Sequence, residues 1–208
     1  MHTLPILSFL IACTLSLTAT ANDVSPVTIN KTANIPLLDG HCDSTEWRGA
    51  TLLQLPANIN IHLMQNEHSV FICAQGKAED YTVLDLYIEH FDTKTLYNLH
   101  ASAQLLERKL IEQQWSQSDF WNHKEWAGFW VPYAGEESSE DGKRTKFLTG
   151  SAREIQVLKK KFSGDAWQMM VEISGIYQNG KYGASFTYPK NAIDTNRSTW
   201  ATFSFSTH

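Results

Sequence analysis

The stretch IPLLDGHCDSTEWRGATLLQL, residues 35–55, decides the fold because its unusual residues have structural rather than chemical roles. Asp39-Gly40 suits a tight turn, since glycine adopts positive φ without the steric penalty that other residues incur. Glu46 and Trp47 are expected in a short helical turn that folds the indole over one end of the domain. Ala50 is then small because this lid lies close to the sheet beneath it. The sequence therefore predicts that Trp47 is buried.

Short runs that alternate apolar and polar residues make up most of the chain. In NINIHLM, residues 58–64, the side chains of Ile59, Ile61 and Leu63 share one face. Comparable runs occupy residues 69–76, 82–90, 94–102, 151–162, 166–174, 182–188 and 198–207. Turn-forming sequences such as Asn179-Gly180 separate them. About eight short strands with such turns predict an antiparallel two-sheet β-sandwich.

The middle of the chain interrupts this pattern. Residues 103–115 fit neither the strand period nor the helix period, so they are expected to extend a strand or to form a short helix. Residues 116–135 concentrate aromatic side chains, and residues 136–146 have the composition of an exposed hairpin tip or loop. The sequence therefore predicts a single β-sandwich domain over residues 22–208, with an insertion at about residues 103–150.

The first 21 residues are predicted to be a signal peptide. Residues 4–18 are almost wholly apolar or hydroxylic, and no charged side chain precedes Asp23. This run is shorter than the roughly 20 apolar residues that span a membrane. It ends in Ala19-Thr20-Ala21, the pattern that signal peptidase recognises. We therefore expect an exported protein, periplasmic or secreted. The segment ending at Cys13 resembles a lipobox, so a membrane-anchored lipoprotein is the alternative.

Two cysteines, Cys42 and Cys73, remain after such a cleavage. In an oxidising compartment a leftover pair more often forms a disulfide than a metal site, because zinc needs about four ligands and no CxxC spacing occurs. A disulfide between them is therefore predicted. The formal net charge is −5, with no stripe of Lys and Arg, which argues against nucleic acid as a partner.

The order of several motifs resembles that of family 9 carbohydrate-binding modules. Leu38-Asp39-Gly40, Glu46-Trp47 and Ala50 match the first of these motifs. Residues 69–74 and 84–89 approximate two of the family's strands, and residues 164–173 echo a late element. The resemblance spans most of residues 35–206 and is poor through residues 103–150. It implies the sandwich that these modules share with DOMON-like domains, a group that includes sugar binders and haem binders.

The aromatic residues of the insertion are the main candidates for ligand binding. Sugars present flat C–H faces on which Trp and Tyr rings stack, while nearby polar groups bind the hydroxyls. The alternative is that these rings form a small satellite core under a long loop. Trp47, Trp167 and Trp200 are assigned to the core of the sandwich instead. The candidate ligand-binding residues are Trp115, Trp121, Trp126, Trp130 and Tyr133.

Asp85 and Glu89 alternate on one strand and share a face. Paired carboxylates could hold calcium through oxygen ligands or serve a hydrolase. Many sandwich strands carry solvated acids on their outer face, and this is the interpretation that we favour.

Haem binding is a weaker hypothesis. Met169 or Met170 could act as an axial ligand together with His90 or His100, as in some DOMON-like domains. Methionine on a buried strand is ordinarily core filler, which is the favoured interpretation.

The sequence as a whole predicts an exported, non-catalytic binding module for a carbohydrate or a similar polar ligand, without cofactor or metal. No Ser/His/Asp order, GxSxG, HExxH or glycine-rich phosphate loop occurs, so no catalytic motif is recognised. The alternatives are an interaction or structural domain of the cell envelope and, with less support, a haem-binding redox domain.

Overall fold

The computed structural model describes residues 25–43, 45–121, 124–131 and 133–206. The predicted signal peptide and the lipid-anchor alternative at Cys13 lie outside the described residues. Within the described part of the chain, no helix has the length and apolar character needed to cross a membrane.

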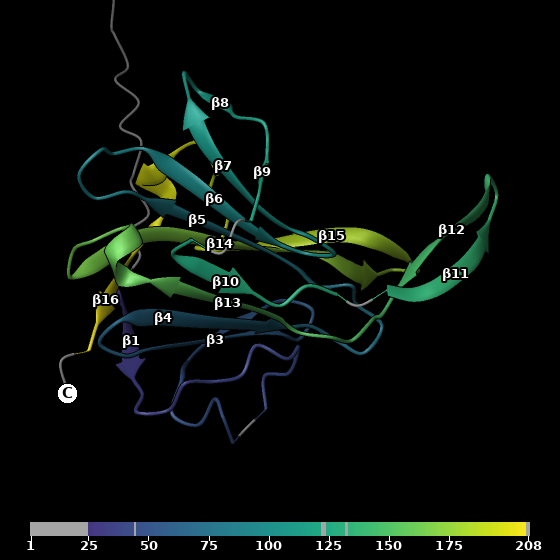
Figure 1. Ribbon diagram of the computed structural model, residues 1–208, viewed down its shortest axis with the longest axis horizontal. Coiled ribbons are helices and arrows are strands. Elements are labelled where there is room, and N and C mark those ends of the chain that lie inside the picture. The colour runs from purple at the N-terminus through teal and green to yellow at the C-terminus, as the bar shows by residue number, and fades with distance from the viewer. Residues whose placement is uncertain (1–24, 44, 122–123, 132, 207–208) are drawn as a thin grey trace, which may run out of the picture.

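The chain folds into two facing β-sheets (Figure 1). The first sheet has the order β10 (Trp126–Gly128), β13 (Arg153–Leu158), β4 (Ser69–Gln75) and β3 (Ile59–Gln65), with β2 (Thr51–Leu55) paired to β3. The second sheet has the order β16 (Ala201–Phe205), β14 (Ala166–Gln178), β5 (Val83–Glu89), β6 (Leu96–Ala101) and β7 (Leu105–Ile111). β15 (Lys181–Tyr188) pairs with β14, while β8 (Gln114–Trp115) and β9 (Asp119–Phe120) pair with β7.

One strand joins the two sheets. β1 (Val27–Lys31) pairs in parallel with β16 through its first residues and with β3 through its last two. The other strand pairs are antiparallel. The predicted two-sheet β-sandwich is therefore confirmed, with a parallel strand at the join that the sequence pattern did not reveal.

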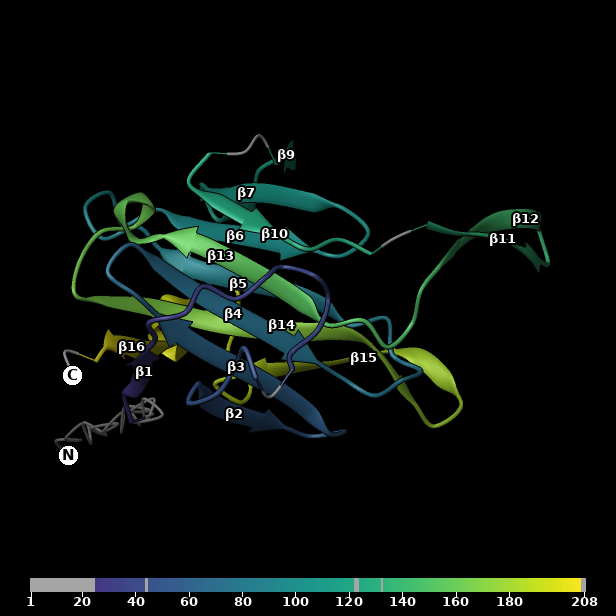
Figure 2. The same ribbon diagram turned by 60° about the horizontal axis from the view of Figure 1, so that its bottom comes forward.

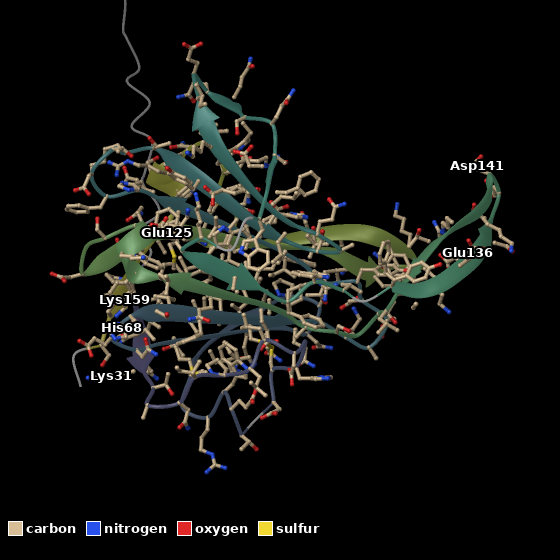
Figure 3. All side chains as sticks on the ribbon, viewed as in Figure 1. Lys31, His68, Glu125, Glu136, Asp141 and Lys159 are labelled. Atoms are coloured by element: carbon tan, nitrogen blue, oxygen red, sulfur yellow. A yellow bond between two sulfur atoms is a disulfide. The ribbon has the colours of Figure 1, made fainter. Side chains whose placement is uncertain are left out.

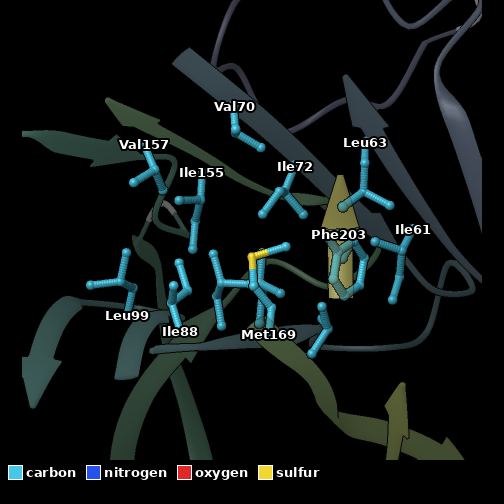
Figure 4. Close-up of a cluster of buried hydrophobic side chains, with 14 of the residues drawn as sticks. Ile61, Leu63, Val70, Ile72, Ile88, Leu99, Ile155, Val157, Met169 and Phe203 are labelled. Carbon is cyan, nitrogen blue, oxygen red and sulfur yellow. The ribbon is translucent and has the colours of Figure 1, made fainter. Parts of the chain in front are cut away.

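The core lies between the inward faces of the two sheets (Figure 4). Ile59, Ile61 and Leu63 of β3 are fully buried, as their spacing predicts. Every second residue of a strand points to the same face, so β5 contributes Leu84 and Leu86 from the opposite sheet. Burying an aliphatic side chain of this size stabilises the fold by about 1.5–3 kcal/mol.

Trp47 is buried as predicted, with 3% of its surface exposed, but its position differs from the expectation. It packs against Met64, Phe71 and Cys73, which point away from the main core on the outer face of the first sheet. Its turn is held by Asp43, whose side chain accepts hydrogen bonds from the amides of Thr45 and Glu46. The indole therefore covers the outer face of a sheet and not one end of the sandwich.

The predicted disulfide between Cys42 and Cys73 is present. The two Cα atoms lie 5.8 Å apart, and the bond closes a sequence separation of 31 residues. It ties the segment before Trp47 to β4, so the covalent bond and the buried indole secure the same stretch of chain.

Part of the predicted insertion at about residues 103–150 belongs to the sandwich sheets. Residues 103–115 take the strand alternative, since β7 continues the second sheet beyond β6. β10 pairs with β13 and forms the edge strand of the first sheet. The part that leaves the body is the hairpin of β11 (Tyr133–Ser139) and β12 (Gly142–Phe147), which projects from one end (Figure 2). Glu136 and Asp141 lie far out on this arm (Figure 3).

A buried carboxylate anchors the Asp39-Gly40 turn. Glu154 of β13 is fully buried, and its Oε2 accepts a hydrogen bond of 2.6 Å from the amide of Gly40. Gly40 has a φ of +88°, and a Cβ there would meet the ring of Phe129 at 2.5 Å. The turn therefore requires glycine both for its backbone angle and for the closeness of this ring.

Trp47→Ala is expected to lower the free energy of unfolding by about 3–5 kcal/mol, because it leaves a cavity against the first sheet. Chemical denaturation of the oxidised protein measures this. Trp130→Ala is the matched control, since 48% of the Trp130 surface is exposed. Equal denaturation midpoints for Trp47→Ala and the wild type would contradict the packing.

Glu154→Gln is expected to change how stability depends on pH. Burial raises the pKa of the Glu154 carboxyl from 4.5 to about 7, against the opposing effect of the Gly40 N–H. Because the folded pKa lies above the unfolded one, this group's contribution to stability is complete below pH 4.5 and is lost as the pH rises through about 7. The variant has no such proton to lose.

Urea denaturation at about pH 5 and about pH 8 tests this linkage. Relative to the wild type, Glu154→Gln should gain stability as the pH rises. Glu140→Gln, an exposed carboxylate at the hairpin tip, is the control and should follow the wild type. Parallel profiles for Glu154→Gln and the wild type would show that the folded carboxyl titrates normally.

Candidate functional site

The outer face of the second sheet carries rows of polar side chains across neighbouring strands. Because Leu84, Leu86 and Ile88 of β5 point into the core, Asp85, Tyr87 and Glu89 point outward. The antiparallel register places Asp85 opposite His100 of β6 on one side and Glu172 of β14 on the other. Tyr87 lies in the next row, opposite Asn98 and Met170. Residues opposite each other on antiparallel strands are close enough for their side chains to interact.

Hydrogen bonds connect these rows into one network. Asp85 Oδ1 lies 2.9 Å from Asn98 Nδ2, which donates to it, and 2.9 Å from His100 Nδ1. Arg108 of β7 donates from Nε and Nη2 to Asn98 Oδ1 at 3.0 and 2.8 Å. His100 Nε2 lies 2.8 Å from Ser102 Oγ. Glu172 lies beside this network through its register opposite Asp85. We call Glu172, Asp85, His100, Asn98 and Arg108 together the polar ladder.

The favoured interpretation of Asp85 and Glu89 as solvated acids is wrong. Their exposed fractions are 8% and 7%, because neighbouring side chains cover them. Asp85 is bound by the polar ladder, while Glu89 Oε2 accepts a 2.6 Å hydrogen bond from Arg197 Nη1. Asp85 and Glu89 are four positions apart on an extended strand, which places their Cα atoms about 13 Å apart. The two carboxylates therefore do not converge on a common ligand.

Burial and neighbouring charge alter the acid–base chemistry of this face. Burial, followed by the charge of Asp85, raises the pKa of the Glu172 carboxyl. Burial also raises the pKa of the Tyr87 hydroxyl, and the charges of Asp85 and Glu172 add to that effect. Tyr87 therefore keeps its proton, and its hydroxyl donates to Glu172 Oε2 at 3.5 Å. The face presents both donors and acceptors in fixed positions.

Two aromatic rings border the ladder at the β7 edge of the sheet. Trp115 packs against Tyr87 at a centroid distance of 5.5 Å, and the Arg108 guanidinium lies 5.6 Å from its ring centre. Trp115 Nε1 donates to Asp194 Oδ2 at 2.8 Å, which fixes the ring. Phe120 of β9 is opposite Leu106, which is itself opposite His100, so Phe120 lies on the ladder's side of the sheet. Its surface is 72% exposed.

The five ring residues predicted as a binding cluster occupy different places. Trp115 borders the ladder, whereas Trp126 is buried in the main core with its Nε1 donating to Glu107 Oε2. Trp121 is half-buried against that core. The ring of Trp130 packs edge-on against the ring of Trp121, with the ring centroids 5.8 Å apart. Tyr133, 63% exposed, starts the projecting hairpin. Trp126 is therefore a core residue, as in the alternative that the sequence left open. The five predicted residues do not share one site.

The tryptophans assigned to the core and the two methionines considered as haem ligands pack in hydrophobic clusters. Trp167 is in the main core, while Trp200 packs on the outer face of the second sheet with Tyr87 and Met170. Met169 points into the core, so it lies on the opposite side of the sheet from His100. Among the described residues, no three His, Cys, Asp or Glu side chains form a group suited to a metal ion.

Sequence reasoning missed the ladder because each of its members looks ordinary by itself. The visible signal was the placing of polar residues inside two apolar strands, LDLYIE at 84–89 and LYNLHA at 96–101. Only the register shows that these residues are neighbours across the sheet.

No protein-family profile and no curated protein matches the chain. Solved structures do. A candidate carbohydrate-binding protein from Bacteroides uniformis covers 87% of this chain and 99% of its own, with a TM-score of 0.53 and 10% identity. A family 9 carbohydrate-binding module from Caldicellulosiruptor kristjanssonii in complex with glucose covers 88% of this chain and 96% of its own, with a TM-score of 0.49 and 11% identity. The same module with cellotriose has a TM-score of 0.46 and 8% identity, covering 88% and 94%. The chain therefore has the two-sheet β-sandwich fold expected from its resemblance to family 9 carbohydrate-binding modules.

Proposed function

We propose that this protein is a non-catalytic carbohydrate-binding module and that it binds saccharide on the outer face of the second sheet. The observation that carries the proposal is the polar ladder bordered by Trp115 and Phe120. The similarity of fold to a candidate carbohydrate-binding protein is consistent with it.

The ladder suits a ligand rich in hydroxyl groups. Asn98 is fully buried and Asp85 is 8% exposed, so these two hold the ladder together from beneath. A sugar hydroxyl both donates and accepts, and the half-buried groups that it would meet are His100, Arg108 and Glu172. Because Asp85, Asn98 and Arg108 already fix one another, binding requires little further ordering of side chains. The exposed ring of Phe120 supplies a flat apolar surface for a C–H face.

Catalysis has less support than binding. Asp85 and Glu172 occupy paired positions, and Glu172 has a raised pKa, so the pair invites comparison with the two carboxylates of glycoside hydrolases. Asp85 Oδ1, however, already accepts from Asn98 Nδ2 and lies 2.9 Å from His100 Nδ1, and only 8% of the residue is exposed, so little of the carboxylate could reach a substrate. Both side chains project from the same face of one sheet, on adjacent strands, and not from opposite walls of a cleft.

Export and the absence of a cofactor belong to the same proposal. The disulfide suits an oxidising compartment, where such bonds persist. The apolar segment before Asp23 suits a secretory signal. The proposal includes neither calcium nor haem. Asp85 Oδ1 already lies within hydrogen-bond distance of Asn98 and His100, and Glu89 Oε2 accepts from Arg197; Met169 points into the core.

Asp85→Asn and His100→Ala are expected to weaken saccharide binding by at least about tenfold each, because each removes a charged or hydrogen-bonding group of the ladder. A glycan array first identifies the ligand, and calorimetry then measures the dissociation constants. Circular dichroism checks that the variants fold. The matched control is Glu140→Gln, which alters an exposed carboxylate in the turn between β11 and β12 of the projecting hairpin.

Two results would contradict the proposal. Full affinity in both folded ladder variants would move the site elsewhere on the molecule. Failure of any glycan to bind the oxidised wild-type protein would remove the function itself.

Incubation with the glycan identified by the array is expected to release no new reducing ends above a protein-free blank. Mass spectrometry of the recovered glycan provides the readout. Cleavage that is lost in Glu172→Gln would show that the carboxylate pair is catalytic.

A further inference from the structure

A groove runs along the side of the sandwich where β7 and β9 of the second sheet meet β10 of the first. It has a volume of about 380 Å³, within the range of small-ligand sites. β9 is held to β7 by its own pairing and by the amide of Trp121, which donates to the Leu105 carbonyl at 3.0 Å. The Leu158 amide donates to the Glu125 carbonyl at 2.8 Å on the other side. We call this cavity the edge groove.

The floor of the edge groove is fixed by packing and by ion pairs. Trp126 is 4% exposed, and its Nε1 donates to Glu107 Oε2 at 3.1 Å. Lys161 Nζ lies 3.0 Å from the same Glu107 oxygen and 3.7 Å from Glu125 Oε2. The side chain of Lys161 is only 10% exposed, so this pair is shielded from solvent. The groove therefore keeps its shape before any ligand binds.

The charges that line the edge groove cancel. Three carboxylates face three ammonium groups, so the formal sum is zero and neither an anion nor a cation gains long-range attraction. Aromatic rings from Phe120 and Trp121 lie among these charges. Flat apolar surface mixed with many polar groups fits an uncharged polyhydroxyl ligand. The charged residues are Glu107, Asp119, Glu125, Lys109, Lys124 and Lys161.

Phe120 connects the edge groove with the polar ladder. It lines the groove, and its register with Leu106 also places it on the outward side of the second sheet, in the row of His100 and Asp85. Its neighbour Asp119 is opposite Glu107, on the groove side of the same strand pair. The exposed ring therefore stands between two polar surfaces.

We propose that the edge groove is a second saccharide subsite, so that the ligand is an uncharged oligosaccharide that runs from the ladder across Phe120 into the groove. The proposal rests on the proposed function at the ladder. It adds a requirement for chain length and for absence of charge, which the ladder alone does not impose.

The test compares matched tri- and hexasaccharides of the glucan, xylan, mannan and chitin series by calorimetry on the full chain. In the series that binds, the hexasaccharide is expected to bind about tenfold more tightly than the trisaccharide. Phe120→Ala and Asp119→Ala should each reduce that advantage to about twofold or less. Tyr182→Ala is the control, since it removes another exposed ring, 46% exposed, which lies on β15 and contacts Tyr81 and Tyr177.

The outcomes separate this proposal from the function on which it rests. If no oligosaccharide of either length binds, both are overturned. If both lengths bind equally and Asp85→Asn weakens both, the ladder stands and the edge groove is not a subsite. Unchanged hexasaccharide affinity in Phe120→Ala and Asp119→Ala has the same meaning. Tighter binding of a galacturonate or glucosamine hexamer than of the neutral hexamers would overturn the inference of an uncharged ligand.

Discussion

The alternation of side chains along β5 is the constraint on which the rest of the structure depends. Leu84, Leu86 and Ile88 point into the core. Because successive side chains of a strand point to opposite faces, Asp85, Tyr87 and Glu89 must lie on the outer face. A slip of one residue would bury two carboxylates between the sheets, which would cost far more than the core gains. The hydrophobic core and the candidate site are therefore fixed by the same register.

The neighbouring strands repeat this division of roles. β14 buries Met169 and Val171 and presents Glu172 outward. β6 buries Leu99 and presents His100. Because three strands agree, the outward residues stand in neighbouring rows, and hydrogen bonds connect those of β5, β6 and β7. Because Asp85 is surrounded by these hydrogen-bonded neighbours, less than a tenth of its surface is exposed.

Much of the fold was predictable because its signals are local. Alternation identified the strands from β3 to β6, and the pattern around Trp47 indicated a buried indole. The Cys42–Cys73 bond followed from counting cysteines. β1 was missed because its parallel pairing with β3 and β16 depends on segments distant in sequence.

The candidate site was harder to predict because its parts are joined only by tertiary contacts. Aromatic density drew attention to residues 115–133. The fold keeps Trp121, Trp126 and Trp130 together, but Trp115 lies on the outer face of the second sheet and Tyr133 begins the projecting hairpin. Trp126 is buried in the core, where its indole N–H has a hydrogen-bond acceptor in Glu107 of β7. Trp115 crosses to the outer face with Tyr87 and Arg108. An aromatic count cannot distinguish these outcomes, since each depends on a partner supplied by another strand.

The central claim is that saccharide binds on the outer face of the second sheet. The most direct measurement is an amide-resolved NMR titration of the oxidised protein with the glycan that it binds. The largest chemical-shift changes are expected at Asp85, His100, Arg108 and Glu172 and in the residues beside them. Changes confined to the first sheet, or to the hairpin formed by β11 and β12, would contradict it.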